Sequence, residues 1–314
     1  MSRPRRDARR AYVEAMGSLG KHFHRQYNEG NRDIIGLLKA EESNLLRARS
    51  LARHLGLWST LLDTMQGLYQ LYDHSGRGLE LARLVGEIEP DFVDPTTGNP
   101  QPGREDSWIV VTQYRVRAAM AARRWKEAES LQQRSVEWSR ARARTEDRSS
   151  IRTLAACLHE LGQIRRGIGL ADCLEAYRES FDLTISIHDN TPAATVALNL
   201  GNAYSDLPAL LNLDKAQRWY RESLRLRREG DRLGRARCLG QPGAVAFRRF
   251  QGVLEFDRPV SEAWQYLTEA THLYQEALQT IPGDAIGDLA RAHNHLASAY
   301  QAAGRTRPRP APLQ

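Results

Sequence analysis

The amino-acid sequence predicts an all-α protein, a right-handed superhelical solenoid of antiparallel helix pairs with about 13 helices. Apolar residues recur at helical spacing along most of the chain, and the only β-like run, Trp108–Val111, opens a helical segment. At 314 residues the chain exceeds the size at which one compact core is usual. A solenoid removes that limit, because each layer packs only on its neighbours.

The clearest helix pair lies in residues 196–224. Large and small residues alternate along both helices, at Leu200, Gly201, Tyr204, Ala216, Tyr220 and Ser223. Small residues let two helix axes approach closely, and large residues fill the space beside them. This alternation predicts that the two helices form one structural repeat.

The first part of the chain, 1–89, is predicted to form helical hairpins, with helices over 8–28, 33–54, 57–73 and from Gly76 or Gly78 to Glu89. Residues 90–107 follow, with four prolines and two glycines, and cannot be helical throughout. They could be a hinge between subdomains or a long surface loop. We favour the loop, because apolar periodicity resumes at Trp108.

Residues 108–304 read as a degenerate array of helix pairs, followed by a disordered tail over 305–314. The pairs are predicted at 108–123 with 125–142, 148–167 with 169–187, 192–206 with 213–229 and 232–251 with 260–281, before a lone helix at 285–303. That last helix has no partner, so its apolar stripe should be partly exposed.

Pieces of the repeat recur at unequal spacing. Leu161-Gly162 matches Leu200-Gly201, and Ala270, Tyr274, Ala277 and Pro282 repeat the pattern of the second helix. Equivalent positions lie 39, 42 and 54 residues apart, against about 34 in the standard repeat. We place the insertions at 205–213 and near 255–259, and we expect Pro242 to kink or interrupt its helix.

With these residues in view, the chain resembles the tetratricopeptide-repeat regions of bacterial signalling NTPases of the STAND class. The resemblance to the repeat superfamily covers residues 150–304. Resemblance to the STAND subtype rests on residues 38–46, LKAEESNLL, which look like the acidic-Asn-Leu helix that opens such regions. The resemblance implies a sensor or partner-binding arm whose enzymatic work is done elsewhere in the polypeptide.

No catalytic set, cofactor site or metal site is predicted, so we expect a non-enzymatic protein. The segment nearest to a phosphate loop, Ala15–His22, has Ala where the motif needs Gly and His where it needs Ser or Thr. Without an NTPase module, the chain is either a stand-alone repeat protein or a fragment of a larger one. The last helix, which lacks a cap, could also support self-association.

The net charge of +7 and pI near 9.5 allow a second reading, a nucleic-acid-binding regulator that uses its arginine-rich helices. All but four of the 45 basic residues are arginines, yet they spread over almost every helix beside acids, as on solvated helix faces. We therefore rank this reading second. Three scattered cysteines and the absence of a long apolar run favour a cytoplasmic protein without membrane contact.

In this repeat superfamily, the first helix of each pair lines the concave surface. Projecting the repeat gives ten candidate partner-binding residues: His159, Gln163, Arg166, Asn199, Asn202, Asp206, Arg237, Arg248, Arg291 and Asn294. The groove should be polar and mostly cationic. It would suit an extended protein segment, particularly an acidic or carboxylate-ended peptide.

Overall fold

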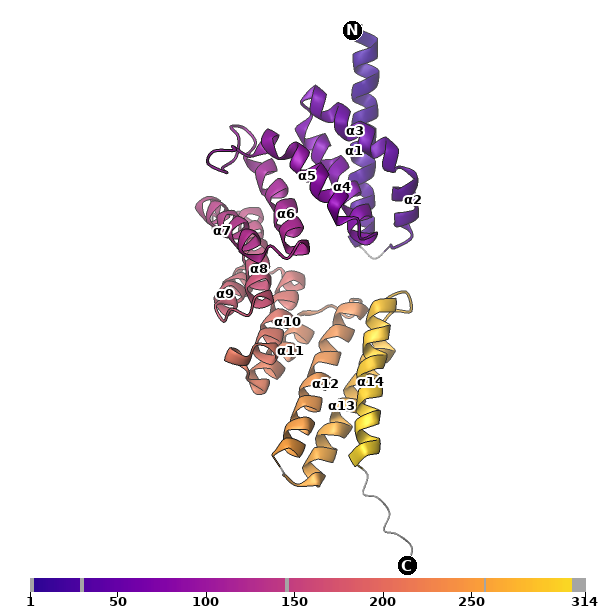
Figure 1. The fold of residues 1–314 in the computed structure, drawn as a ribbon, viewed down its shortest axis with the longest axis vertical. Coiled ribbons are helices and arrows are strands. Elements are labelled where there is room, and N and C mark those ends of the chain that lie inside the picture. Colours follow the sequence, from indigo (N-terminus) through magenta and orange to yellow (C-terminus); the bar gives the residue numbers. More distant parts are fainter. Residues whose placement is uncertain (1–2, 29–30, 145–146, 257, 307–314) are drawn as a thin grey trace, which may run out of the picture. The chain divides into compact units, whose positions relative to one another are not determined.

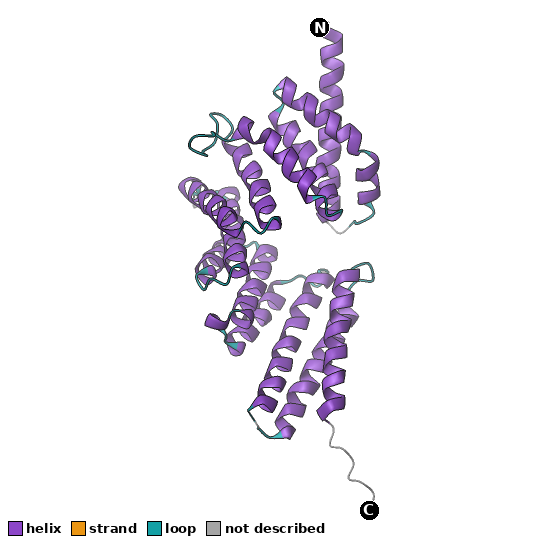
Figure 2. Cartoon of the chain, in the orientation of Figure 1, coloured by secondary structure: helices purple, strands orange, loops and turns teal. Residues whose placement is uncertain are grey.

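A computed structural model describes residues 3–28, 31–144, 147–256 and 258–306. Over these residues the chain forms fourteen α-helices and one short 3-10 helix, with no strand (Figures 1 and 2). This confirms the all-α prediction. The chain divides into two compact units, 1–135 and 136–314.

Unit 1 holds the first six helices and most of the seventh. They are α1 (Arg3–Asn28), α2 (Ile34–Ala40), α3 (Glu42–Leu55), α4 (Trp58–His74), α5 (Gly78–Phe92), α6 (Glu105–Ala121) and α7 (Trp125–Arg142). The division between the units falls inside α7, at 135/136. It does not coincide with the Pro/Gly-rich segment, which joins two helices of the same unit.

Unit 2 contains three successive helix pairs and a last helix. They are α8 (Arg148–Gly167), α9 (Cys173–Ser186), α10 (Asn190–Asp206), α11 (Leu213–Leu226), α12 (Arg232–Glu255), α13 (Val260–Thr280) and α14 (Ile286–Thr306). The predicted tail begins inside α14, and its residues 307–314 lie outside the described part of the chain.

Helix α4 is the centre of unit 1, with α1, α2, α3, α5 and α6 all packed on it. Two glycines let α1 cross it closely: a Cβ at Gly20 would lie 2.7 Å from the Asp63 carbonyl oxygen, and one at Gly67 would lie 2.9 Å from the Gly20 Cα. The glycines of the Ala15–His22 segment thus serve helix packing. The segment lies within the continuous helix α1 and forms no phosphate loop.

The predicted single helix over 33–54 is wrong, because the structure has two helices that break at Glu41. Glu41 has φ −92° and ψ 2°, outside the helical region. Helix α2, through buried Ile34 and Leu38, and helix α3 both pack on α1 and α4. The break accounts for fourteen helices where about thirteen were expected.

The Pro/Gly-rich segment is shorter than the sequence indicates. Helix α5 continues to Phe92, with Pro90 in its last turn. The remaining connection, 93–104, is ordered by a bridge between Val93 and Pro100. The Asp94 carboxylate also accepts the Thr96 and Thr97 amides, at 2.8 and 3.0 Å.

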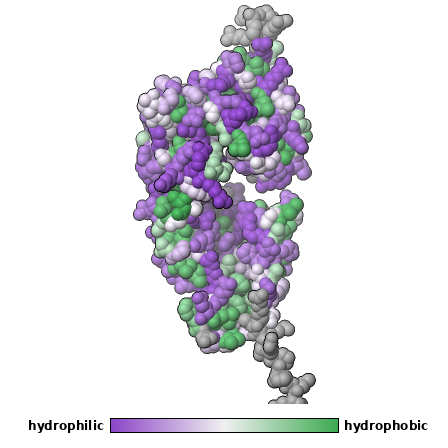
Figure 3. All heavy atoms as spheres, in the orientation of Figure 1, coloured by the Kyte–Doolittle hydropathy of each residue, from purple (hydrophilic) through white to green (hydrophobic). Residues whose placement is uncertain are grey.

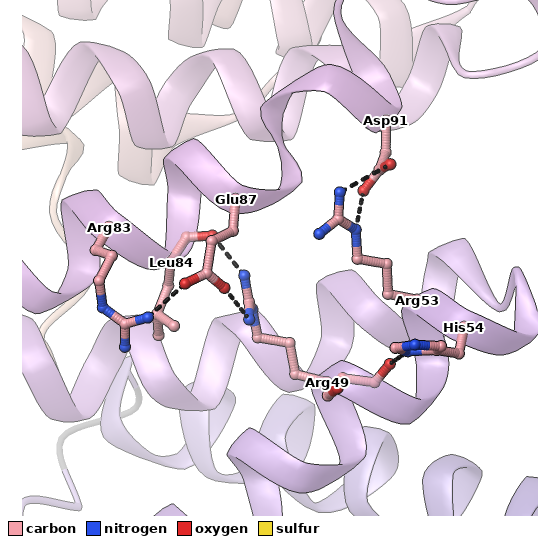
Figure 4. Close-up of polar contacts among 8 residues, drawn as sticks. Arg49, Arg53, His54, Arg83, Leu84, Glu87 and Asp91 are labelled. Atoms are coloured by element: carbon pink, nitrogen blue, oxygen red, sulfur yellow. Dashed lines mark hydrogen bonds and ion pairs between the residues drawn. The ribbon is translucent and has the colours of Figure 1, made fainter.

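Buried arginine ties α3 to α5 (Figure 4). The Arg49 side chain, 7% exposed, donates to Glu87 at 2.8 Å and to the Leu84 carbonyl at 2.7 Å. One turn later, Arg53 donates hydrogen bonds to both carboxylate oxygens of Asp91, at 2.6 and 3.2 Å. Arg83 pairs with Glu87 from the solvent side. Long cationic side chains thus join two helices that both flank α4.

In unit 2, each helix pair has the same close contact between a glycine of its first helix and a tyrosine of its second. A Cβ on Gly162, Gly201 or Gly243 would meet the ring of the paired tyrosine at 2.5, 2.4 or 2.8 Å. Those partners are Tyr177, Tyr220 and Tyr274. Glycine is required here because a larger residue would displace the ring. The predicted alternation of small and large residues is therefore the packing unit of these pairs.

Pro242 does not interrupt its helix, contrary to one of the expected outcomes. Helix α12 runs unbroken from Arg232 to Glu255 with Pro242 inside it. Proline removes one backbone donor, yet the adjacent Gly243 packs against Tyr274 of α13. Tertiary packing with α13, the most extensive of any helix pair here, holds the helix through the proline.

The extra residues of the long repeats lie in two different places. Residues 205–213 contain the short 3-10 helix Pro208–Leu210, as expected for an inserted turn. Near 255–259 the turn is short, and the added length lies in the helices: α12 has 24 residues and α13 has 21. The apolar stripe of α14 is partly covered, with Ala299 buried and Tyr300 52% exposed.

Candidate functional site

The first helices α8, α10 and α12 bring six of the ten predicted site residues into two hydrogen-bonded groups. Corresponding positions meet at a near-constant offset: His159 contacts Asn199 and Arg166 contacts Asp206, each 40 residues apart. Arg248 contacts Ser205, 43 residues away. These offsets lie within one residue of the 39- and 42-residue spacings read from the sequence, so side chains at equivalent positions link the successive first helices.

One group is a chain of amides that links three helices. The Asn199 amide nitrogen donates to His159 Nε2 at 2.7 Å, and the Asn202 amide lies 3.4 Å from Asn199 Oδ1. The Tyr220 hydroxyl of α11 donates to Asn202 Oδ1 at 3.1 Å. Both hydrogen-bonding atoms of the Asn199 amide are used within the protein.

The other group is an arginine pair that shares one aspartate. Asp206, at the end of α10, lies 3.1 Å from Arg166 of α8 and 3.7 Å from Arg248 of α12. Arg248 also donates to the backbone carbonyl and the hydroxyl of Ser205. The Asp206 and Arg248 side chains are 48% and 45% exposed. Two cations facing one anion leave a net positive charge at this edge.

The remaining candidates lie apart from these groups. Arg237 and Arg291 both approach Asp288 of α14, Arg237 through two bonds of 3.0 and 2.8 Å. Gln163 is half-buried on α8, and Asn294 is exposed on α14. The ten predicted residues therefore do not form one continuous set of contacts.

Asn199 does not face outward, contrary to the prediction. Its side chain is among the buried polar residues, 9% exposed, because it bridges His159 and Asn202. Helical projection places Asn199 on the first-helix surface but cannot show that the preceding repeat covers it. Its role is to hold Asn202 and His159 in position.

Burial changes the pKa values of titratable side chains in this region. It lowers the pKa of His159 to about 4, so the ring is neutral at pH 7 and its Nε2 can accept the Asn199 amide proton. Burial also raises the pKa of Tyr177 and Tyr220 far above the usual tyrosine range. The charge of the site therefore comes from Arg166, Asp206 and Arg248 alone.

Three residues that bind predicted site residues were not among the sequence candidates. Tyr220 was assigned to packing, but besides covering Gly201 with its ring it donates its hydroxyl proton to Asn202. Ser205 accepts from Arg248, 43 residues away, and Asp288 accepts from Arg237, 51 residues away. The repeat offset of about 42 residues was a signal that could have revealed Ser205.

Comparisons with known proteins support the fold. No family model and no curated protein matches this chain. Among solved structures, the crystal structure of BtubC (BKLC) from P. vanneervenii is similar, with TM-score 0.53, 16% identity and coverage of 88% of this chain and 94% of that chain. A circular tandem repeat protein with novel repeat topology also matches, with 16% identity over 94% of this chain and 64% of that one, but its TM-score is 0.22. At this identity the likeness to BtubC shows a helical repeat fold alone.

The surface and the helix lengths add two observations. Hydrophilic residues cover most of the face in Figure 3, and hydrophobic residues lie between them in smaller areas. No helix in the described residues is both long and apolar enough to cross a membrane.

Proposed function

We propose that this chain is a non-enzymatic scaffold that binds an extended segment of a partner protein along α8, α10 and α12. The observation that carries the proposal is the repeated offset between these three first helices, which brings Arg166 and Arg248 to Asp206, one turn after Asn202 on α10. Polar groups repeated at a regular spacing can pair with an extended backbone, whose own polar groups also repeat.

The glycine–tyrosine packing of three successive pairs supports assignment to the tetratricopeptide class of repeat. The further proposal, a sensor arm of a signalling or defence NTPase, rests on the resemblance of residues 38–46, which form the end of α2, the break at Glu41 and the start of α3. In that stretch Leu45 is buried, while the Asn44 carbonyl accepts the Tyr12 hydroxyl at 3.1 Å. The segment thus docks α3 on α1.

The charge at the site favours an acidic partner. Arg166 and Arg248 share a single carboxylate, so one positive charge is left to attract an acidic or carboxylate-ended segment. Arginine also binds carboxylates with defined geometry. We therefore expect an acidic side chain or chain end near the ends of α8 and α10.

The alternative function, nucleic-acid binding through the arginine-rich helices, receives less support. The two densest arginine clusters lie in residues 134–144 and 225–237, where Arg140, Arg225, Arg227 and Arg237 each pair with a carboxylate. A phosphate-binding stripe needs cations that are available together on one face.

Binding of fluorescent acidic peptides with free carboxyl ends tests the proposal. We expect the double variant Asn202→Ala/Arg248→Ala to weaken the best peptide about tenfold or more, since charged hydrogen bonds contribute about 1.5–3 kcal/mol. Arg249→Ala is the matched control, because Arg249 is the next residue of α12 and pairs with Asp214, away from Asn202. Equal affinity for the double variant and the control would refute the assignment.

Salt dependence separates the two candidate functions. A protein partner bound through a few ion pairs should lose little affinity between low and moderate salt. Nucleic acid binding through many phosphate contacts falls steeply over the same range. Tight DNA or RNA binding with a steep salt slope, and no peptide binding, would favour the nucleic-acid regulator instead.

A further inference from the structure

A pocket lies between α12, α13 and α14, outside the groups at Asp206. The space it outlines is about 480 Å³, a volume that includes open solvent. Figure 1 shows these three helices side by side at the carboxyl end of the chain. The lining combines small apolar side chains with the charged Arg237, Asp288 and Arg291, a combination found at sites for small amphipathic ligands.

Small side chains create the hollow. Ala236, Gly240 and Ala244 recur at four-residue spacing along α12, so they lie on one face of that helix. Ala277 of α13 stands opposite: a Cβ built on Gly240 would have only the Ala277 Cβ near it, at 3.9 Å. Ala292 of α14 adds a further small wall. The pocket therefore exists because these positions carry small side chains or none.

Two arginines supply positive charge to the pocket lining. Arg237 is bound to Asp288 through two hydrogen bonds, and Arg291 lies 3.7 Å from the same carboxylate. Asp288 thus neutralises one guanidinium and leaves one positive charge. The Arg291 side chain lines the pocket and is 63% exposed.

The other residues that line the pocket are uncharged, and outside the lining Arg248 acts on Tyr274 and Asp231 acts on Arg237, one charge of each sign. Gln241 can donate an amide proton, and Tyr274 and His295 stack at 5.2 Å along the wall. Burial and the nearby Arg291 lower the pKa of His295, which favours the neutral ring at pH 7. One uncompensated cation above an apolar floor matches a ligand with one negative charge and a short apolar body.

We propose that this pocket binds a small organic acid, with its carboxylate on Arg291 and its apolar group over Gly240. The site does not depend on the peptide-binding surface at Asp206. A bound acid would contact α12, α13 and α14 at once, so binding would also hold the last helix against the preceding pair.

Titration with sodium butyrate and with neutral butyramide, followed by NMR of the full chain, tests the charge requirement. The two probes have the same number of heavy atoms and differ in charge. We expect butyrate to bind about tenfold tighter than butyramide, because ionised groups make the stronger hydrogen bonds. Equal affinities, or no binding of either, would overturn the proposal.

Two variants locate the site. Gly240→Leu fills the hollow, and Arg291→Gln removes the free charge; each should weaken butyrate binding about tenfold or more. Gly252→Leu is the matched control for the first, since Gly252 is on the same helix with nothing near its Cβ position. Arg232→Gln, an exposed position of α12, controls for the second. Unchanged butyrate binding in both pocket variants would refute the site.

Two further readouts complete the test. Butyrate should slow amide hydrogen exchange in α14, and Gly240→Leu should abolish that effect. A second probe is a peptide with a blocked amino end and a free carboxyl end. If this peptide bound the pocket while butyrate did not, the small-acid assignment would be overturned and a protein terminus would be favoured as the ligand.

Discussion

At the scale of single residues, glycine and histidine have roles that depend on one neighbouring ring or amide. Gly201 has no side chain, which makes room for the Tyr220 ring. The Tyr220 hydroxyl then donates a hydrogen bond to Asn202. Packing and the candidate binding site are thus joined at one tyrosine. Substitutions at these positions should reveal how tightly the two are coupled.

Replacing Gly201 with alanine should destabilise the protein, even though alanine is the better helix former. The new Cβ would lie 2.4 Å from the Tyr220 ring, and overpacking of this kind costs about 1–3 kcal/mol. Gly252→Ala is the control, because its Cβ would meet nothing within 4 Å. We expect the control to be neutral or more stable by up to about 1 kcal/mol in urea unfolding. Equal effects of the two variants would contradict the packing role.

His159 should make stability depend on pH. Its pKa is lowered from 6.5 to about 4 in the folded state, so the unfolded chain binds the extra proton and stability is lost as the pH falls from 6.5 towards 4. One pKa unit corresponds to about 1.4 kcal/mol, and we expect a loss of about 2 kcal/mol between pH 7.5 and 5. Urea unfolding of wild type and His159→Gln at both pH values isolates this loss. A loss of the same size in the variant would assign it to other groups.

At the scale of helices, charged side chains join elements whose backbones barely touch. Helices α3 and α5 are connected by Arg49 and Arg53 beside α4. Arg49 is buried and Arg83 is exposed, yet both donate to the same Glu87. This pair of arginines offers a direct comparison of buried and surface ion pairs.

We expect Arg49→Ala to lower the free energy of unfolding by about 2–4 kcal/mol, because it removes a buried ion pair and leaves the Leu84 carbonyl without its donor. Arg83→Ala should cost less than about 0.5 kcal/mol, since exposed pairs contribute little. Chemical denaturation of the two variants gives the comparison. Similar losses in both would show that burial does not strengthen the Arg49 contact.

At the scale of the whole molecule, the chain divides into two compact units, and the division falls inside α7. In repeat proteins each layer is stabilised by its neighbours, so unfolding can remain local. The division predicts that damage in one unit is only weakly felt in the other.

Hydrogen exchange can test this division with Gly201→Ala, which lies in unit 2. We expect faster exchange across α8–α12 and unchanged protection in α1–α5, because local unfolding follows the contacts of the altered residue. Arg49→Ala should give the reverse pattern. An equal loss of protection in both units would show that the chain unfolds as one cooperative body.

The sequence by itself determined the fold class and the repeat unit. Helical periodicity located the helices of unit 2 within a few residues at most ends, and the alternation of small and large residues identified the helix pair that contains Gly201 and Tyr220. These features are local, because side chains three and four residues apart share a helix face whatever the rest of the chain does.

Only the tertiary structure decided which faces are covered. It broke the helix at Glu41, carried α12 through Pro242 and buried Asn199 between His159 and Asn202. It also separated the arginines into pairs around Asp206 and Asp288. Each outcome depends on a residue at least 18 positions away or on packing against another helix. The hydrophobic periodicity of a single helix contains no information about such contacts.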